Sequence, residues 1–313
     1  MVHEIANALV PFFFSMTMGF LAGKVKHGKL PVVSINTMLV DYALPFALFV
    51  YTANMKRESF ASHLLPILVL AIVMLAPYFA SLALSKYAFG VERRLAAVRS
   101  VTIGMPNFAA VGLPLLHAVY GEESTLTVAL AITTASVVMS PACLILLEQA
   151  KTAGHDQPKS QLMFKALRNT FVKPVVIAPI AGVAFALAGW HLPTLATQSL
   201  NIIGNTTAGL ALFSTGMVLA AQPFKINLEV IVSVLLSNVG QPVLAWICTL
   251  LLGLPAPIAG PIILLAAIPC GSFGILFGLS YAVQDSSAGT TLVASSLLSA
   301  LSLSATIYLL AHL

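Results

Sequence analysis

Long apolar runs alternate with short polar segments along the whole chain. Each run is close to the roughly 20 residues that a helix needs to cross the hydrocarbon core of a bilayer. The pattern therefore predicts an all-α polytopic membrane protein. Ten transmembrane helices are expected, at residues 5–23, 32–53, 63–86, 95–119, 124–148, 171–190, 196–221, 229–253, 257–283 and 287–312.

The composition agrees with this pattern. The chain is 59% hydrophobic and 8% charged, whereas a soluble domain carries about 25% charged residues. The net charge of +5 does not indicate nucleic-acid binding, because no basic stripe with interleaved aromatic residues is present. Cys143, Cys248 and Cys270 all fall inside apolar runs without a CxxC pair, so neither a metal site nor a disulfide framework is expected. No cofactor is predicted.

The basic residues set the expected orientation. If the N-terminus lies outside, every Lys and Arg except Lys56 and Arg57 falls on the inner side, which is the distribution that cytoplasmic loops show. The first apolar run follows Glu4 and precedes Lys24 and Lys26, the reverse of a cleavable signal peptide. Ten spans then leave both termini outside.

Spans four and nine contain residues that interrupt a helix. Span four carries GMPNFAAVGLPLL, which begins at Gly104, and span nine carries AAIPCGSFG, which begins at Ala266. Proline removes a backbone donor and glycine weakens a helix, so both spans are expected to break near their middle. One such pair is compatible with a simple kink, but two at matched positions indicate a transport site.

The two breaks belong to an internal repeat. Residues 43–55 resemble residues 208–220, and Pro77 in span three corresponds to Pro242 in span eight. Spans one to five thus recur as spans six to ten, and an odd number of spans must insert upside down the second time. We expect a first repeat at residues 1–150, a cytoplasmic linker at 151–170 and an inverted second repeat at 171–313, the architecture of many secondary transporters.

The predicted substrate site lies at the breaks. A broken helix exposes backbone N–H groups, and the N-terminus of the second half-helix attracts anions. Asn and Ser are favoured at such N-termini, and a polar cluster in span seven adds further donors. The candidate binding residues are Gly104, Pro106, Asn107, Pro269, Cys270, Gly271, Ser272, Asn205 and Thr206. Helix capping by Ser272 and helix packing by the span-seven cluster are the alternatives.

Asp41 is the acid that the predicted spans place well inside the membrane. Ionisable groups at that depth are costly and usually functional, so Asp41 is the candidate site for a coupling ion. The alternative is that Asp41 lies nearer the surface, or is capped by a neighbour. The sequence leaves open coupling to H⁺, to Na⁺ or to neither.

Four stretches carry a resemblance to a known family. They are DYALPFALF from Asp41, MPNFAAVGLPLL from Met105, KPVVIAPIAG from Lys173 and NTTAGLALFSTGMVLA from Asn205. With the ten spans and the two breaks, the chain resembles the auxin efflux carrier family over its whole length. That family includes plant PIN auxin carriers and bacterial permeases for malonate, malate and other organic acids.

The resemblance implies that spans four and nine cross at mid-membrane and that a transport domain moves like an elevator against a scaffold. In the plant carriers, an Asn after the crossover proline of each half contacts the substrate carboxylate. Asn107 matches this position, whereas Cys270 and Gly271 stand at its counterpart. The bacterial branch therefore fits better, which implies a malonate-like or malate-like substrate and an inner-membrane location with periplasmic termini.

Other functions are less compatible with the sequence. A sodium-coupled bile-acid-type carrier or an ion/proton antiporter stays an alternative, although an antiporter is expected to keep acids in spans four or nine, and none is present. A membrane-embedded enzyme is not expected, because no constellation such as HExxH occurs, and an ATP-driven pump is not expected, because no P-loop occurs. The expected partners are a small organic anion and the lipid bilayer, and the sequence leaves a homodimer open.

Overall fold

The computed structural model describes residues 2–25, 32–55, 64–121, 124–152, 164, 168, 172–221 and 225–311. In this part of the chain all regular secondary structure is helical, and the one β-type contact is an isolated bridge. The predicted all-helical class is therefore confirmed. Several helices contain one π-helical turn, labelled η, of the kind that occurs as a bulge within α-helices.

Helices occupy each of the five stretches expected in the first half. They are α1 (Val2–Val25); α2 (Val32–Met38), η1 (Leu39–Ala43) and α3 (Leu44–Ala53); α5 (Leu64–Ala83) and η2 (Leu84–Ala88); α6 (Arg93–Gly104), η3 (Phe108–Gly112) and α7 (Leu113–Tyr120); and α8 (Thr125–Thr134), η5 (Ala135–Met139) and α9 (Ser140–Thr152).

Helices likewise occupy each stretch expected in the second half. They are α11 (Pro174–Leu187); α12 (Thr194–Gly204) and α13 (Thr206–Ala221); α14 (Leu228–Leu235), η6 (Leu236–Gly240) and α15 (Gln241–Leu251); α16 (Ala256–Ala267) and α17 (Phe273–Ser280); and α18 (Ser286–Leu310).

The span expected at residues 196–221 is helical but not continuous. That stretch divides at Asn205, where α12 ends and α13 begins. The Thr206 hydroxyl donates to the Ile203 carbonyl oxygen at 2.6 Å, and such local side-chain bonds compete with the helical ladder. Gly204 lies directly against the backbone of Ala47 in α3, so the division occurs where α12 packs tightly on a neighbouring helix.

Four continuous helical stretches are long and apolar enough to cross a membrane, judged by length and composition. They are Leu64–Ala88, Leu130–Leu147, Leu228–Leu251 and Ser286–Leu310. Phe13–Val25, Val176–Leu187 and Ala256–Ala267 are apolar but shorter. Large hydrophobic side chains also cover the outside of the protein, among them Trp246 and Leu250 of α15. The chain is a multi-pass membrane protein.

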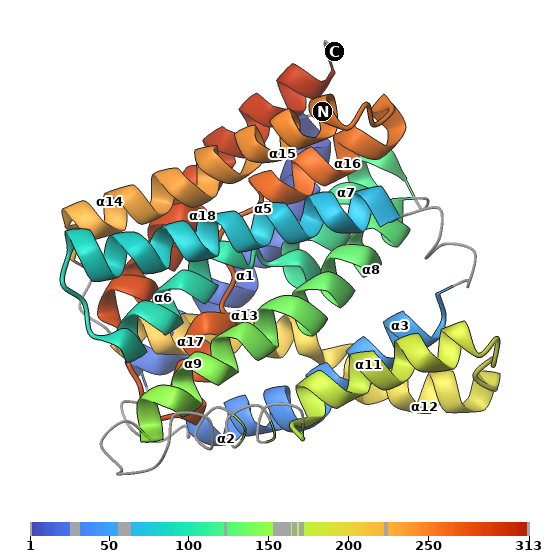
Figure 1. The fold of residues 1–313 in the computed structure, drawn as a ribbon, viewed down its shortest axis with the longest axis horizontal. Coiled ribbons are helices and arrows are strands. Elements are labelled where there is room, and N and C mark those ends of the chain that lie inside the picture. Colours follow the sequence, from blue (N-terminus) through green and yellow to red (C-terminus); the bar gives the residue numbers. More distant parts are fainter. Residues whose placement is uncertain are drawn as a thin grey trace.

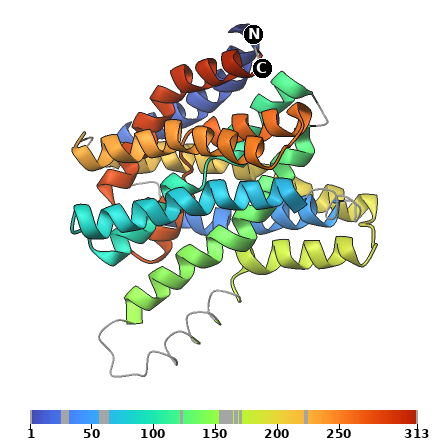
Figure 2. The same cartoon turned by 45° about the horizontal axis from the view of Figure 1, so that its top comes forward.

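The helices pack in two groups. In one group α1 lies along α13, and α3 packs against α11 and α12. The other contains α5, α6 and α14–α18, with α6 against α5 and α17, and α15 against α5 and α16. In Figure 1, α3, α11 and α12 lie together at the lower edge, while α5 runs beside α14 and α15 above them. The beginning of α1 and the end of α18 lie at the same end of the protein in Figure 1 and Figure 2.

Candidate functional site

Two interrupted helical stretches meet inside the protein. After α6 ends, three residues without helical structure precede η3, and five separate α16 from α17. Pro106 and Cys270 form an antiparallel bridge between these two segments. The Asn107 N–H donates to the Pro269 carbonyl oxygen, and the Gly271 N–H donates to the Thr102 carbonyl oxygen, each at 3.2 Å. Backbone groups that the interruptions free are thus paired across the contact, as a low-dielectric interior requires.

Glycines allow this close approach. A Cβ atom added at Gly271 would fall on the Met105 carbonyl oxygen, and one at Gly274 would fall on the backbone of α6 at Val98 and Thr102. These neighbours are mainly backbone atoms, which cannot rotate away. The absence of a side chain at Gly271 and Gly274 therefore lets the segment from α16 to α17 lie directly on α6.

Polar side chains of two further helices brace the crossing. The Cys270 N–H donates to the Ser295 hydroxyl oxygen at 3.0 Å, and that hydroxyl donates to Asn238 Oδ1 at 2.6 Å. Gln241 Nε2 donates to the carbonyl oxygen of Ile103, the last residue but one of α6, at 2.9 Å. Asn238 and Gln241 are not among the residues predicted from the sequence. Two amide side chains inside an otherwise apolar span are the signal that could have identified them.

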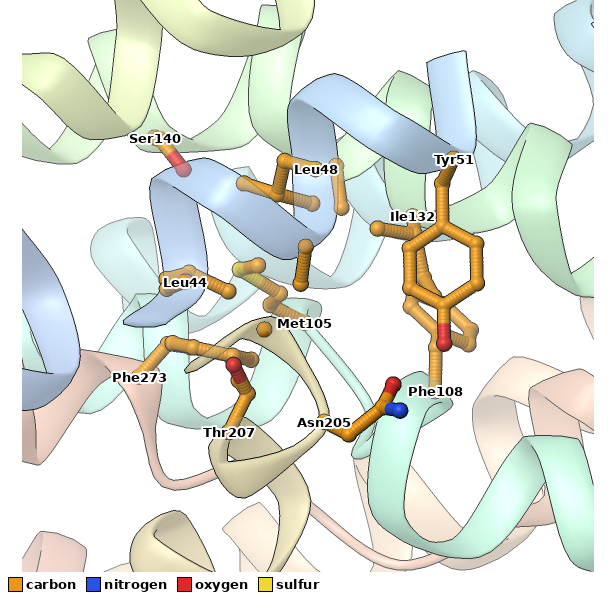
Figure 3. Close-up of a pocket in the computed structure, with 13 residues that line it drawn as sticks. Leu44, Leu48, Tyr51, Met105, Phe108, Ile132, Ser140, Asn205, Thr207 and Phe273 are labelled. Carbon is orange, nitrogen blue, oxygen red and sulfur yellow. The ribbon is translucent and has the colours of Figure 1, made fainter. Parts of the chain in front are cut away.

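A cavity of about 90 Å³ lies beside the crossing. About 10–15 Å³ suffices for one water molecule, so the cavity has room for several waters or a small organic molecule. It is shown in Figure 3 and is lined by Leu44, Ala47, Leu48, Tyr51, Met105, Phe108, Ile132, Ala135, Ser140, Gly204, Asn205, Thr207 and Phe273.

The cavity joins the two interrupted stretches to the division between α12 and α13. Met105 precedes the bridge, Phe108 begins η3, and Phe273 begins α17. Asn205 and Thr207 come from the opposite side, from the start of α13. The starts of η3 and α17 and the division between α12 and α13 therefore all border the same cavity.

The lining is mainly apolar, with a few neutral polar groups. Tyr51, Ser140, Asn205 and Thr207 carry the polar side chains, and no charged residue is among the described lining residues. Thr207 is buried, and its hydroxyl has no hydrogen-bond partner in the described part of the chain. A buried hydroxyl without a partner is costly, so this group is available to a molecule in the cavity. Figure 3 shows the Thr207 hydroxyl and the Asn205 amide reaching toward the cavity from one wall.

The sequence-predicted residues fall into three places. Asn205 lines the cavity, whereas Thr206 is exposed and bonds the Ile203 carbonyl oxygen instead. Asn107 and Ser272 are buried next to lining residues without lining the cavity themselves, and the Ser272 hydroxyl has no partner among the described residues. The residues that form or flank the crossing itself are Gly104, Pro106, Pro269, Cys270 and Gly271.

Asp41 lies at the surface of the described part of the protein. It belongs to η1, and its side chain is exposed. The described part of the protein thus does not enclose Asp41, and its role as the site for a coupling ion stays a prediction. A π-helical turn inserts one extra residue into the helix, so the face that Asp41 presents cannot be inferred from a regular helical period. Asp41 is also not among the residues that line the cavity.

The crossing, the small cavity and the apolar helices define a membrane transport protein. The chain belongs to the auxin efflux carrier family, since the family model described as "Membrane transport protein" matches residues 4–307. The protein is thus a transporter and not an enzyme.

Relatives from bacteria and plants match almost the whole chain. "Uncharacterized transporter YfdV" of Escherichia coli (strain K12) is 25% identical over 92% of this chain and 91% of its own length. The "Putative malonate transporter" of Rhizobium meliloti (strain 1021) is 26% identical over 98% and 96%. "Auxin efflux carrier component 8" of Arabidopsis thaliana is 23% identical over 90% of each chain.

Proposed function

We propose that this protein is a secondary transporter of a small organic anion, which binds in the cavity beside the crossing. The observation that carries the proposal is the buried Thr207 hydroxyl without a partner, in a cavity that both interrupted stretches border. Binding sites in secondary transporters form where discontinuous helices meet near the bilayer midplane. The proposed substrate is a carboxylate, and its site includes Asn205 and Thr207 with Asn107 and Ser272 behind the lining.

The cavity suggests how an anion is held without a salt bridge. Phe108 and Phe273 begin helical segments, and helix N-termini carry about half a positive charge that favours anions. The Thr207 hydroxyl and the Asn205 amide supply neutral donors. A carboxylate bound this way keeps modest affinity, which permits release on either side of the membrane.

The lining further favours an anion with one carboxylate and an apolar body. Leu44, Leu48, Met105 and Ile132 contribute apolar surface, which a second carboxylate would have to face without a cationic partner. Burying an unpaired charge is costly. The Rhizobium meliloti relative is named for malonate, so malonate and malate belong in any substrate panel, together with small monocarboxylates.

We further propose that the helices form an inverted repeat of residues 1–150 and 171–313, joined by the linker 151–170. The packing of α1 on α13 has a counterpart in that of α11 on α3, and α5 on α6 corresponds to α15 on α16. Matching helix contacts of this kind are expected of two structurally equivalent five-span units. Both chain ends lie at one end of the protein (Figure 2), consistent with ten spans and periplasmic termini in a bacterial inner membrane.

Transport would then follow an elevator mechanism. The group that contains α1, α3, α11, α12 and α13 would act as the scaffold, and the group with the crossing would carry the substrate. The cavity lies between the two groups, since Leu48 comes from the first and Phe273 from the second. A relative movement of the groups would open the cavity to one side of the membrane and then to the other.

Counterflow in proteoliposomes tests the proposal. Vesicles are loaded with an unlabelled acid, and entry of the same labelled acid is measured for malonate, malate and a series of monocarboxylates. The proposal predicts exchange of at least one carboxylate, with monocarboxylates preferred, and a weaker apparent affinity in Thr207→Val. Absence of exchange for every carboxylate, in vesicles that contain folded protein, would contradict it.

A further inference from the structure

The cavity beside the crossing has a buried part and a more open part. Thr207 and Ser140 are buried residues of its lining. Tyr51 is half-buried and Asn205 is exposed, so the cavity comes nearest to the outside of the described part of the protein where these two residues line it. In Figure 3 the Tyr51 ring lies along one side of the cavity, and its hydroxyl is directed toward the Asn205 amide. The two polar side chains thus share one region of the lining.

The Tyr51 hydroxyl is available to a bound molecule. Tyr51 and Leu48 lie three residues apart on α3 and both line the cavity, as expected for neighbours on one helix face. No hydrogen bond joins the Tyr51 hydroxyl to another described residue. A phenolic hydroxyl both donates and accepts, and both capacities of Tyr51 are therefore open to a substrate.

Asn205 presents a donor and an acceptor to the same region. Its backbone N–H donates to the Asn201 carbonyl oxygen at 2.9 Å, whereas its side chain makes no hydrogen bond to a described residue. Whichever way the amide is turned, its NH₂ group donates and its carbonyl oxygen accepts. An ionised carboxylate has acceptors only, so it matches the NH₂ group and leaves the amide oxygen of Asn205 unmatched.

A hydroxyl group on the carbon next to the carboxylate matches both side chains. It donates to the Asn205 amide oxygen and accepts from the Tyr51 hydroxyl, while the carboxylate accepts from the Asn205 NH₂ group and the Thr207 hydroxyl. The two polar atoms of one amide are neighbours, so the two substrate groups have to be neighbours as well. An oxo group at that carbon would accept but not donate. A second carboxylate would add a charge that no described lining residue balances.

The volume of the cavity limits the length of the substrate. A cavity needs about 10–15 Å³ to hold a first water, and a water in the liquid occupies about 30 Å³. The cavity of about 90 Å³ therefore holds about three to nine groups of that size. This suits an acid of about three to five carbons, whose alkyl end can lie against Leu44 and Ile132.

We propose that the transported anion is a short 2-hydroxy monocarboxylate and that Tyr51 and Asn205 together recognise its hydroxyl group. The inference rests on the proposed function, since it names the substrate class of the same site. Lactate and 2-hydroxybutyrate belong to this class. Propionate and butyrate are the same two acids without the hydroxyl, and each pair isolates the contribution of that one group.

Competition in counterflow measures this contribution. Proteoliposomes exchange a labelled carboxylate, and the concentration that halves the exchange is determined for lactate, propionate, 2-hydroxybutyrate, 3-hydroxybutyrate and butyrate. We expect each 2-hydroxy acid to bind about threefold to tenfold more tightly than its parent acid, the range for one neutral hydrogen bond. The acid 3-hydroxybutyrate should bind no more tightly than butyrate, because its hydroxyl is not adjacent to the carboxylate.

Tyr51→Phe removes the hydroxyl and keeps the ring. In this variant the lactate preference over propionate should fall to less than about twofold, since propionate makes no use of the lost group. The ratio of the two affinities is the readout, because a loss that affects both acids equally cancels. Tyr120→Phe is the matched control. Tyr120 ends α7, its hydroxyl lies against Gly260, and it is not among the lining residues, so this variant should keep the lactate preference of the unmodified protein.

Equal inhibition by lactate and propionate in the unmodified protein would overturn the inference, and so would a lactate preference that persists in Tyr51→Phe. If Tyr51→Phe exchanges no acid, the unmodified protein decides: tighter binding of 2-hydroxybutyrate than of 3-hydroxybutyrate supports the inference, and equal binding overturns it. In each of these cases the unmodified protein still exchanges carboxylates, and the proposed function stands. Absence of exchange for every carboxylate in the unmodified protein would refute the proposed function and the inference with it.

Discussion

Gly271→Ala tests the crossing with the smallest possible change. The added Cβ would fall on the Met105 carbonyl oxygen, 3.2 Å from the Met105 carbonyl carbon and 3.3 Å from that of Pro106. These atoms belong to the backbone, so the two interrupted segments must separate. Separation weakens the bond from the Asn107 N–H to Pro269 and the bond from the Gly271 N–H to Thr102.

The expected loss of stability can be estimated from these contacts. Each backbone hydrogen bond contributes about 0.5–1.5 kcal/mol, and insertion of a methyl group into a close-packed site costs about 1–3 kcal/mol. Gly271→Ala should therefore destabilise the crossing by about 2–6 kcal/mol and abolish exchange or reduce it strongly. Purified protein should unfold several degrees lower in a thermal melt in detergent, and counterflow in proteoliposomes measures the loss of transport.

Gly209→Ala is the matched control. Gly209 lies in α13, and a Cβ added there meets no heavy atom within 4 Å. Alanine is the better helix former by about 1 kcal/mol, so this variant should melt at the same or a higher temperature and transport normally. Normal exchange and an unchanged melting temperature in Gly271→Ala would show that the close contact of the two segments is wrong.

Three further variants test separate parts of the site. Thr207→Val should weaken the apparent affinity in counterflow about tenfold to a hundredfold, because it removes a hydrogen bond to a charged group. The melting temperature should not change, and an unchanged affinity would show that the hydroxyl does not contact the substrate. Asn107→Ala should weaken affinity at normal expression, because Asn107 supports the cavity lining from behind, and unchanged transport kinetics would exclude it from the site. Lys173→Met removes a cation–π contact to the Tyr281 ring at 4.7 Å, which is worth about 0.5–2 kcal/mol and joins the two helix groups. It should change the reaction rate of a single cavity cysteine with a thiol reagent added from one side, and an unchanged rate would exclude a role in the movement.

The helical class and the family could be predicted from the sequence because both depend on local patterns. In lipid, an apolar run of about 20 residues forms a helix because its backbone groups have to be hydrogen-bonded within the segment. The stretches from Met105 and Asn205 carried the resemblance to the family. The division at Asn205 was missed, since it depends on the contact of Gly204 with α3 and on a hydroxyl bond of Thr206. Neither is visible in a hydropathy pattern.

The ion pairs of Arg99 with Glu229 and Asp285 could not be predicted from a local pattern. Arg99 lies 130 and 186 residues from its two partners, and such pairs form only when the fold brings distant helix ends together. Arg99 was interpreted through the charge bias of the loops, as a marker of the inner side. The position of Asp41 within a predicted span did not show whether the protein would enclose its side chain, and the structure leaves that side chain exposed.

Substrate protection of one cysteine in the cavity tests the central claim most directly. Cys143, Cys248 and Cys270 are replaced by alanine, and Ser140→Cys then places a single thiol in the cavity lining. We predict that the transported carboxylate slows modification by a small thiol reagent, with half-protection at the concentration that half-saturates exchange, while a cysteine at exposed Glu92 reacts at a constant rate. Intact exchange with no protection at saturating carboxylate would show that the anion binds elsewhere.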